Sequence, residues 1–395
     1  MPKVIIMGGS LGGLTAALFL REAGCAVTVS ERSTTPLVGL GAGIVLNPAT
    51  VRYFTRSKIL DVAALSTTAH WLRYLDPRGQ VVAEQHCAYR FTSYNAIYRE
   101  LLAAFGTDNY LLGEAVTAFE QAPESVSVQL SSGRMENCDL LVCADGIRST
   151  ARARLLPHTA MNYAGYVAWR GIVEENMVPR EIFAALSNSI TYYLLPNSHI
   201  LIYPIPIVDS GSDRVRLVFN WLWYRNIPAG PGLANLMTDR EGVLREVSLG
   251  AGAVQETNIA ALHQDATSLL PPPLAEMVLA TTQPFLQAVM DCEVDRMAFG
   301  RICLIGDAAF VARPHAAAGT AKAAEDGWQL AQAIQASAGE VVSALQRWEP
   351  AQLALGRTIL DRTREAGRRA QVDNTWQIGD PLPFGLYSIG DSSMP

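Results

Sequence analysis

A glycine-rich turn near the N-terminus has the residue types and the spacing of a nucleotide-binding loop. The run Gly8–Gly13 lies between a strand-like apolar stretch and a helical pattern, and Glu31 ends the next strand-like stretch. Small residues let a pyrophosphate approach the backbone N–H groups of a helix N-terminus, and the acid can accept hydrogen bonds from ribose hydroxyls. The middle glycine of the usual pattern is replaced by Ser10, and a glycine-rich turn without a ligand is the alternative. The candidate contacts are Gly8, Ser10, Leu11, Gly13, Glu31 and Arg32.

Two later strand-like runs each lead to an aspartate. Asp145, followed by Gly146, comes after one apolar run, and Asp307 comes after another. Ligands of doubly wound folds bind at the carboxyl ends of the strands, which is where both acids are expected. A common turn and a helix cap are the alternatives for the two acids. A loop of small residues follows Asp307 and can lie flat against a planar ring, with candidate contacts at Pro314, Ala318 and Gly319.

His315, in the same loop, is the first candidate for acid–base chemistry. Histidine has an unperturbed pKa near neutral pH, so it suits a site that must exchange a proton with its ligand. His199, at the start of a strand-like run, is another candidate. Tyr203, near the end of that run, and Tyr94 are weaker candidates for substrate contact. A structural hydrogen bond from the histidine and buried, satisfied tyrosine hydroxyls are the alternatives.

The elements needed to position these residues are those of an α/β protein. A strand, a glycine turn and a helix follow one another in three distant stretches, at residues 3–31, 139–156 and 300–336, which favours a doubly wound parallel sheet. Runs of β-forming residues predict an antiparallel sheet at residues 190–195, 199–205 and 215–223. A helical stretch is expected to begin at Pro271–Pro273, and a helical tail from about 339 to 370 is expected to lead into a loosely ordered Pro/Gly/Ser-rich end.

Composition and charge limit the classes of partner. The 395 residues are 49% hydrophobic and 17% charged, which is enough for two packed domains or one domain with a large insertion. The net charge of −6 comes without a basic block, so the sequence gives no sign of binding nucleic acid or an anionic membrane surface. A small-molecule partner is favoured.

The cysteines and the apolar runs indicate a cytoplasmic protein. The six cysteines show neither paired spacing nor a C-x-x-C clip, so we expect reduced, buried thiols and no metal site. The uncharged stretch 4–20 is interrupted by glycines, which suits a strand, turn and helix better than a signal peptide. No run has the length of a membrane-spanning helix.

Together, the glycine-rich turn and the two aspartate turns resemble the motifs of the FAD-dependent aromatic hydroxylases of the p-hydroxybenzoate hydroxylase type. The resemblance extends over most of the chain. It implies that Gly8–Gly13 and Glu31 hold the ADP half of non-covalently bound FAD. It further implies that Asp145 lies in a segment serving FAD and NAD(P)H, and that Asp307 binds the ribitol.

Longer segments are similar to family members that hydroxylate hydroxypyridines, namely Arg90–Tyr94, Tyr163–Gly171, Tyr203–Pro206 and Arg313–Gly319. Three positions depart from the wider family, because Tyr94, Phe310 and Ala317 stand where other members often have arginine, histidine and glycine. The run Trp221–Trp223 is similar to a flavin halogenase signature. Its spacing to the following Ile-Pro is too long, and its alternation favours cross-strand aromatic packing.

The resemblance implies a monooxygenase acting on a small electron-rich aromatic ring such as 2,6-dihydroxypyridine. NADH or NADPH would reduce FAD, and O₂ would form a C4a-hydroperoxide that transfers oxygen to the ring. A base such as His315 would favour the ionised ring hydroxyl. Epoxidation, oxidative decarboxylation and a non-catalytic flavoprotein that binds an aromatic compound stay open, because the motifs report the cofactor and not the substrate. A homodimer is left open in the same way.

The expected fold is an α/β protein with a doubly wound FAD-binding domain, an inserted antiparallel β-sheet substrate domain and a helical C-terminal segment. The FAD-binding domain would consist of residues 1–70, 92–170 and 285–345. The substrate domain would consist of residues 71–91 and 171–284, and the C-terminal segment of residues 346–395.

Overall fold

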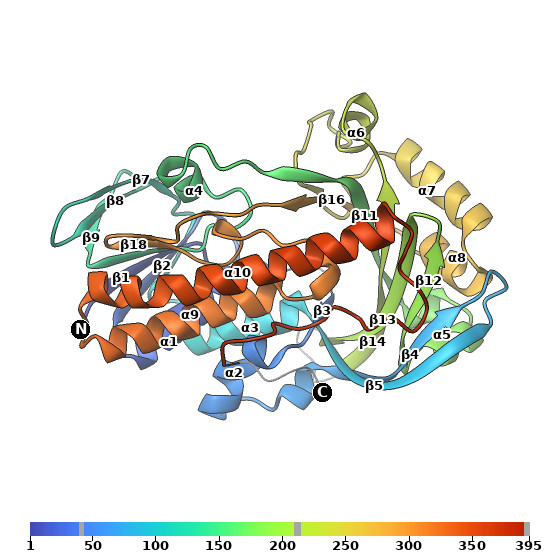
Figure 1. The fold of residues 1–395 in the computed structure, drawn as a ribbon, viewed down its shortest axis with the longest axis horizontal. Coiled ribbons are helices and arrows are strands. Elements are labelled where there is room, and N and C mark those ends of the chain that lie inside the picture. The colour runs from blue at the N-terminus through green and yellow to red at the C-terminus, as the bar shows by residue number, and fades with distance from the viewer. Residues whose placement is uncertain (39–42, 209–214, 391–395) are drawn as a thin grey trace.

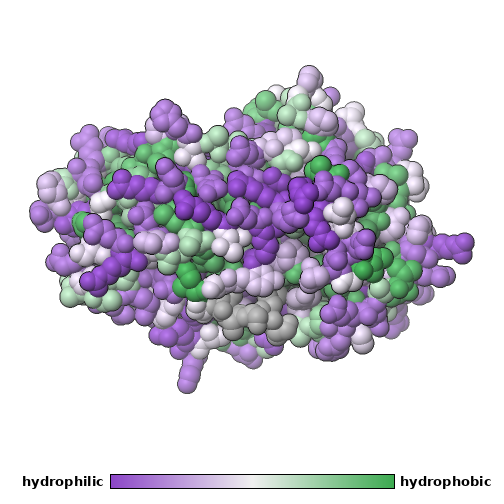
Figure 2. Space-filling view, viewed as in Figure 1, coloured by the Kyte–Doolittle hydropathy of each residue, from purple (hydrophilic) through white to green (hydrophobic). Residues whose placement is uncertain are grey.

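The computed structural model describes residues 1–38, 43–208 and 215–390. Two sheets lie at opposite ends of an elongated molecule, and the long helix α10 (Val341–Gln371) runs from one end toward the other (Figure 1). The expected helical tail is therefore confirmed. Figure 2 shows hydrophilic side chains along the outward face of this helix, which fits the alternation of buried apolar and exposed charged residues in its sequence.

The first sheet is the predicted doubly wound one. Its central strands are parallel and buried over most of their length, as expected for apolar runs covered on both faces. Among the described residues the strand order is β17 (Ala298–Phe299), β18 (Ile302–Leu304), β10 (Leu140–Cys143), β1 (Lys3–Met7), β2 (Ala26–Glu31) and β6 (Tyr110–Leu112). Helix α1 (Leu11–Glu22) packs against α9 (Gly319–Ala336) and α3 (Tyr94–Phe105), so stretches far apart in sequence share one core.

The second sheet contains the β-rich runs, and the predicted antiparallel pairing of residues 190–224 is confirmed. Every neighbouring pair in this sheet is antiparallel except β4 with β12. The strand order is β15 (Ser248–Leu249), β16 (Phe285–Asp291), β11 (Asn162–Glu174), β14 (Val215–Asn226), β13 (Ser198–Val208), β12 (Ser189–Leu195), β4 (Thr67–Leu75), β5 (Val81–Ser93) and β3 (Gly43–Val45). A small third sheet consists of β7 (Val116–Gln121), β8 (Val126–Leu130) and β9 (Met135–Cys138).

The two faces of the large sheet have different neighbours. One face packs against α7 (Glu256–Leu269) and α8 (Pro272–Leu279), the helix expected at the triple proline. Trp221 and Trp223 are fully buried on this face, and Trp223 pairs across the strands with Trp169. The run that is similar to a halogenase signature is thus core packing, as the alternation predicted. The remaining helices are α2 (Pro48–Ser57), α4 (Thr150–Leu155), α5 (Arg180–Leu186) and α6 (Pro231–Leu236).

The C-terminal end corrects one expectation. The residues after α10 were expected to be loosely ordered, yet the stretch before residue 391 folds back along the large sheet (Figure 1) and buries Leu382, Phe384 and Leu386. Prolines and glycines surround these apolar side chains, so the Pro/Gly/Ser-rich composition of the segment did not indicate that it packs against the core. Residues 391–395 lie outside the described residues.

The domain boundaries stay a prediction, and the pairing of two strands bears on them. Strand β11 begins before residue 170, and β16 begins at residue 285, yet both pair within the large sheet. We therefore propose that residues 162–170 and 285–291 belong to the substrate region. No helix within the described ranges is both long and apolar enough to span a membrane.

Candidate active site

The ends of four strands bring the predicted cofactor residues to one edge of the first sheet. Strands β18, β10, β1 and β2 are consecutive and parallel, with Met7 opposite Cys143 and Ser30, and Cys143 opposite Leu304. The residues that follow these strands therefore emerge side by side. They are Gly8, Asp145, Gly306 with Asp307, and Glu31 at the end of its strand.

The glycine-rich turn fits a pyrophosphate. A Cβ on Gly13 would lie 1.9 Å from the carbonyl oxygen of Gly8, and one on Gly8 would lie 2.4 Å from that of Ala144, so neither position can hold a side chain. Ser10, the residue before α1, is extended and its hydroxyl caps no helix amide, which leaves the N–H groups of the first turn free for an anion. Glu31 accepts hydrogen bonds from the amides of Gly9 and Ser33, each at 2.8 Å. Leu11 is buried, and Arg32 is exposed beyond the strand.

Two of the departures from the wider family pattern lie in contact. The Ser10 hydroxyl is 2.7 Å from that of Tyr94, which begins α3. Burial raises the pKa of Tyr94 to about 12, so its hydroxyl stays protonated at neutral pH. Tyr94 does not line the cavity between the first sheet and the large sheet, so its hydrogen bond to Ser10 associates it with the nucleotide turn.

Asp145 organises the second turn. Its carboxylate accepts hydrogen bonds from the Ser149 hydroxyl at 2.6 Å and the Ala151 amide at 3.2 Å, which holds the start of α4. Gly146 follows with φ of +77°, a conformation that favours glycine. Arg152 on α4 donates to the carbonyl oxygens of Asp307 and Ala308, at 3.0 and 3.1 Å. Two motifs that are remote in sequence are thus directly linked.

Asp307 faces a cavity. Its carboxylate is accessible from the cavity and accepts no hydrogen bond from the residues that the structure describes. Desolvation by the surrounding protein raises the pKa of Asp307 to about 6, although the positive charges of Arg152 and Lys322 lower it in part. This free acceptor beside the start of α9 is suited to sugar or polyol hydroxyls. The helix-cap alternative is not supported, because the carboxylate accepts no hydrogen bond from a helix amide among the described residues.

The loop after Asp307 is held against the segment that follows β3. The amide of Asn47 donates to the carbonyl oxygen of Ala317 at 2.9 Å. Ala317, which replaces the family's glycine, still adopts φ of +50°. Pro314, Ala318 and Gly319 all line the cavity, as do Gly43–Val45 of β3. The backbone on two sides of the cavity can therefore enclose a planar ring system.

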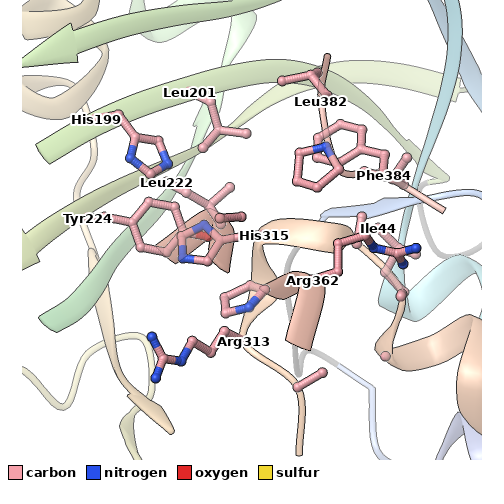
Figure 3. A pocket seen from close by; sticks show the side chains of 18 of the residues that line it. Ile44, His199, Leu201, Leu222, Tyr224, Arg313, His315, Arg362, Leu382 and Phe384 are labelled. Carbon is pink, nitrogen blue, oxygen red and sulfur yellow. The ribbon is translucent and has the colours of Figure 1, made fainter. Parts of the chain in front are cut away.

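The cavity has a volume of about 500 Å³ and joins the two halves of the molecule. One wall is the loop after Asp307, and the opposite wall is the second face of the large sheet. Alternate residues of β13 and β14 point into it, namely His199, Leu201, Tyr203, Leu222 and Tyr224. Figure 3 shows His199, Tyr224 and His315 grouped on one side, with Ile44, Leu382 and Phe384 on another.

Of the four candidate side chains, His315, His199 and Tyr203 line this cavity, whereas Tyr94 does not. The ring centroid of His315 lies 5.8 Å from that of His199 and 4.9 Å from that of Tyr224. Tyr203 lies apart from this group, since its hydroxyl donates to the Gly43 carbonyl oxygen at 3.1 Å and its ring stacks on Phe91. The structure thus brings the two histidines together and gives Tyr203 a structural partner.

Each histidine keeps one ring nitrogen without a hydrogen bond partner among the described residues. His315 Nε2 lies 2.7 Å from the Tyr166 hydroxyl, which leaves Nδ1, and His199 Nδ1 lies 2.9 Å from the Gln371 amide, which leaves Nε2. Burial, followed by the charge of Arg313, lowers the pKa of His315 to about 3. Burial also lowers the pKa of His199 well below its usual value. Both rings are therefore neutral at pH 7 and can donate or accept a hydrogen bond.

Some cavity residues were not among the sequence-based candidates. Arg170 on β11 lines the cavity, and its buried Nε atom has no hydrogen bond partner in the part of the chain that the structure describes. Gly367 of α10 allows the helix to lie close to His315 and Tyr166, because a Cβ there would lie 2.5 Å from the Tyr166 hydroxyl and 3.2 Å from His315 Nε2. Arg170 belongs to a segment that resembles hydroxypyridine hydroxylases, which was the available signal. Nothing in the sequence indicated Gly367.

A nucleotide turn on a parallel sheet, an unpartnered aspartate and a cavity between that sheet and a second one define an FAD-dependent oxidoreductase. The comparisons with known proteins agree. A family model described as FAD binding domain-like matches residues 163–291, and one described as FAD binding domain matches residues 251–363.

The 2,6-dihydroxypyridine 3-monooxygenase of Paenarthrobacter nicotinovorans is 36% identical to this chain over 394 residues, covering 99% of this chain and 98% of that protein. The chain belongs to the FAD-dependent aromatic hydroxylases. The solved structure of 2,6-dihydroxypyridine-3-hydroxylase from Arthrobacter nicotinovorans matches with a TM-score of 0.91 and 34% identity, covering 100% and 98% of the two chains. Klebsiella pneumoniae HpxO, complexed with FAD and uric acid, shares the fold with a TM-score of 0.76 and 21% identity, covering 94% of this chain and 90% of that one.

Proposed function

We propose that this enzyme hydroxylates a hydroxypyridine, such as 2,6-dihydroxypyridine, with NADH or NADPH and O₂. The ring C–H becomes C–OH, one oxygen atom of O₂ enters the product and the other leaves as water. The reduced nicotinamide and one proton supply the two electrons and the hydrogen. The similarity to a 2,6-dihydroxypyridine 3-monooxygenase over nearly the whole chain supports this substrate class.

One observation carries the proposal. The cavity joins the loop after Asp307 with a sheet face that presents two neutral histidines, each with an unpartnered ring nitrogen. A ring with several polar substituents offers hydrogen bond donors and acceptors to such nitrogens, and the apolar walls of Leu201 and Leu222 suit its faces.

The residues present fit FAD, which when bound supplies the reduction and oxygen-activation chemistry. The amides after Ser10 would hold the pyrophosphate, and Glu31 would accept hydrogen bonds from the ribose. Asp307 would accept from ribitol hydroxyls, and the loop Pro314–Gly319 would lie along the flavin ring. Asp145 would act indirectly, because its carboxylate is occupied in holding α4.

His315 would accept a hydrogen bond from a substrate hydroxyl at Nδ1, with Nε2–H donating to the Tyr166 oxygen. This raises electron density on the ring carbon that receives the oxygen atom, so this carbon is a better nucleophile. His199 would orient the ring through Nε2. The low pKa of His315 in the free protein favours hydrogen bonding over full proton transfer, until a bound anion raises that pKa.

The test is a set of hydroxylated pyridines and phenols assayed for stimulated oxidation of NADH and of NADPH, with the product mass determined. The expected result is a gain of one oxygen atom on a hydroxypyridine. Loss of carbon dioxide or formation of an epoxide would support the alternative oxygenations, and ligand binding without turnover would contradict an enzyme. Light scattering of the purified protein tests whether it is a homodimer, and cell fractionation tests the predicted cytoplasmic location.

A further inference from the structure

The segment after α10 forms a wall of the cavity. Five of its residues line the cavity, namely Trp376, Pro381, Leu382, Pro383 and Phe384. Figure 3 shows Leu382 and Phe384 on the side of the cavity away from His199 and Tyr224. Leu382 and Phe384 are each only 7% exposed, which a freely moving tail would not achieve.

This segment is fixed to both halves of the molecule. Near its start, the Asn197 side chain donates to the Val372 carbonyl oxygen at 3.1 Å, which attaches it to the turn between β12 and β13. In its middle, Arg369 of α10 pairs with Asp380 at 2.5 Å. At its end, the Gly385 amide donates to the Ala316 carbonyl oxygen at 3.0 Å, inside the loop proposed to hold the flavin ring. These three contacts therefore fix the position of the wall relative to His199 and His315.

Trp376 places this wall in contact with His199, one of the residues proposed to contact the substrate. Its ring meets His199 edge-on, with centroids 4.9 Å apart, and meets Tyr192 at 5.4 Å. Phe384 packs edge-on against Tyr89 of β5 at 5.4 Å. The cavity must hold both the flavin ring system and the substrate within about 500 Å³, so these aromatic side chains occupy the space into which a larger substrate would extend.

We propose that Trp376 and Phe384 determine substrate size, so that the site admits a single six-membered ring and excludes a fused bicyclic ring. This inference rests on the proposed function. The two hydrogen bonds and the ion pair described above hold the wall in place. A second ring could enter only if Trp376 or Phe384 lost its packing contacts with the neighbouring aromatic side chains. Removing the indole of Trp376 would leave space beside His199.

The experiment compares Trp376→Leu and Phe384→Leu with the parent protein, each with FAD bound. The probes are 2,6-dihydroxypyridine and a dihydroxyquinoline. Dissociation constants are measured from the change in flavin absorbance without reductant, and turnover is measured separately. The expected result for each variant is a gain of about tenfold or more in bicyclic over monocyclic affinity. Ile378→Ala is the matched control, because Ile378 lies in the same segment but is 46% exposed.

An unchanged ratio of the two affinities in both leucine variants, at normal FAD content, would overturn the size filter. A parent protein that binds both rings equally would overturn it as well. These outcomes differ from a failure of the proposed function, which would appear as binding of the monocyclic ring without its oxygenation.

Discussion

At the scale of single residues, the carboxylates at the strand ends have separable roles. Glu31→Gln keeps the size of the side chain but removes the charge that would accept hydrogen bonds from the ribose. We expect FAD affinity to fall by roughly tenfold to a hundredfold, the value of one charge-assisted hydrogen bond of about 1.5 to 3 kcal/mol. Titration of the apoprotein with FAD measures this. Glu22→Gln, at the exposed end of α1, is the control, and equal affinities for both variants would show that Glu31 does not contact the cofactor.

Asp307 predicts a pH dependence of the stability of the FAD-free protein. Its pKa is about 6 in the folded state, against an ordinary value of 3.8 for an aspartate, so the folded state binds more protons between these pH values. The free energy of unfolding should therefore decrease as the pH rises through this window. Asp307→Asn lacks this loss, so the FAD-free variant should unfold at higher urea concentration than the parent at pH 7. The difference should shrink below pH 4, and a difference that is the same at both pH values would contradict the assignment.

His315 is expected to serve oxygen transfer more than cofactor binding. In His315→Ala, FAD should stay bound and NADH oxidation should continue, while hydroxylation falls by about 10² to 10⁴ and hydrogen peroxide accumulates. The measurement is the ratio of hydroxylated product to NADH consumed, at matched flavin content. His158→Ala, at an exposed position outside the cavity lining, is the control. A parallel loss of flavin occupancy and flavin reduction would instead indicate a structural role.

At the scale of elements, α10 packs against the hydrogen-bonded pair of Tyr166 and His315. Gly367→Ala would push a methyl group against the Tyr166 hydroxyl and His315 Nε2, so either the helix or the hydrogen bond must shift. We expect weaker substrate binding and poorer coupling, with FAD affinity little changed, because the proposed cofactor contacts lie on other elements. Kinetics and FAD titration of this variant measure both effects. Gly232→Ala in α6 is the control, since a Cβ there meets nothing within 4 Å, and identical behaviour of the two variants would contradict the supporting role.

At the scale of the whole molecule, one ligand would connect segments from three distant parts of the chain. Non-covalent FAD should therefore raise the melting temperature in a concentration-dependent way, with about 2.7 kcal/mol of stabilisation at a hundred times the dissociation constant. Acid precipitation should leave the flavin in solution, and Asp307→Ala should lose most of its FAD. Flavin retained in the pellet, or a melting temperature independent of added FAD, would contradict this picture.

The sequence by itself predicted FAD as the cofactor and proposed the residues that would hold it, because the signals for these residues are local. Gly8–Gly13 directly follows β1, and Asp307 lies three residues after the end of β18. Short-range sterics require small residues at such turns, and ligand hydroxyls at the carboxyl ends of the strands favour an acid. The alternation of Trp221 and Trp223 likewise predicted a strand with one aromatic face, since a strand has a period of two.

Only the tertiary structure decided which residues meet in the substrate cavity. His315 and His199 are far apart in sequence, and their neutral state follows from burial that no local pattern records. Trp376 and Gly367 had no sequence signal, because their roles depend on how α10 and the tail lie across the large sheet. Contacts between distant segments arise from the packing of whole elements, and a local reading of residue types contains no information on that packing.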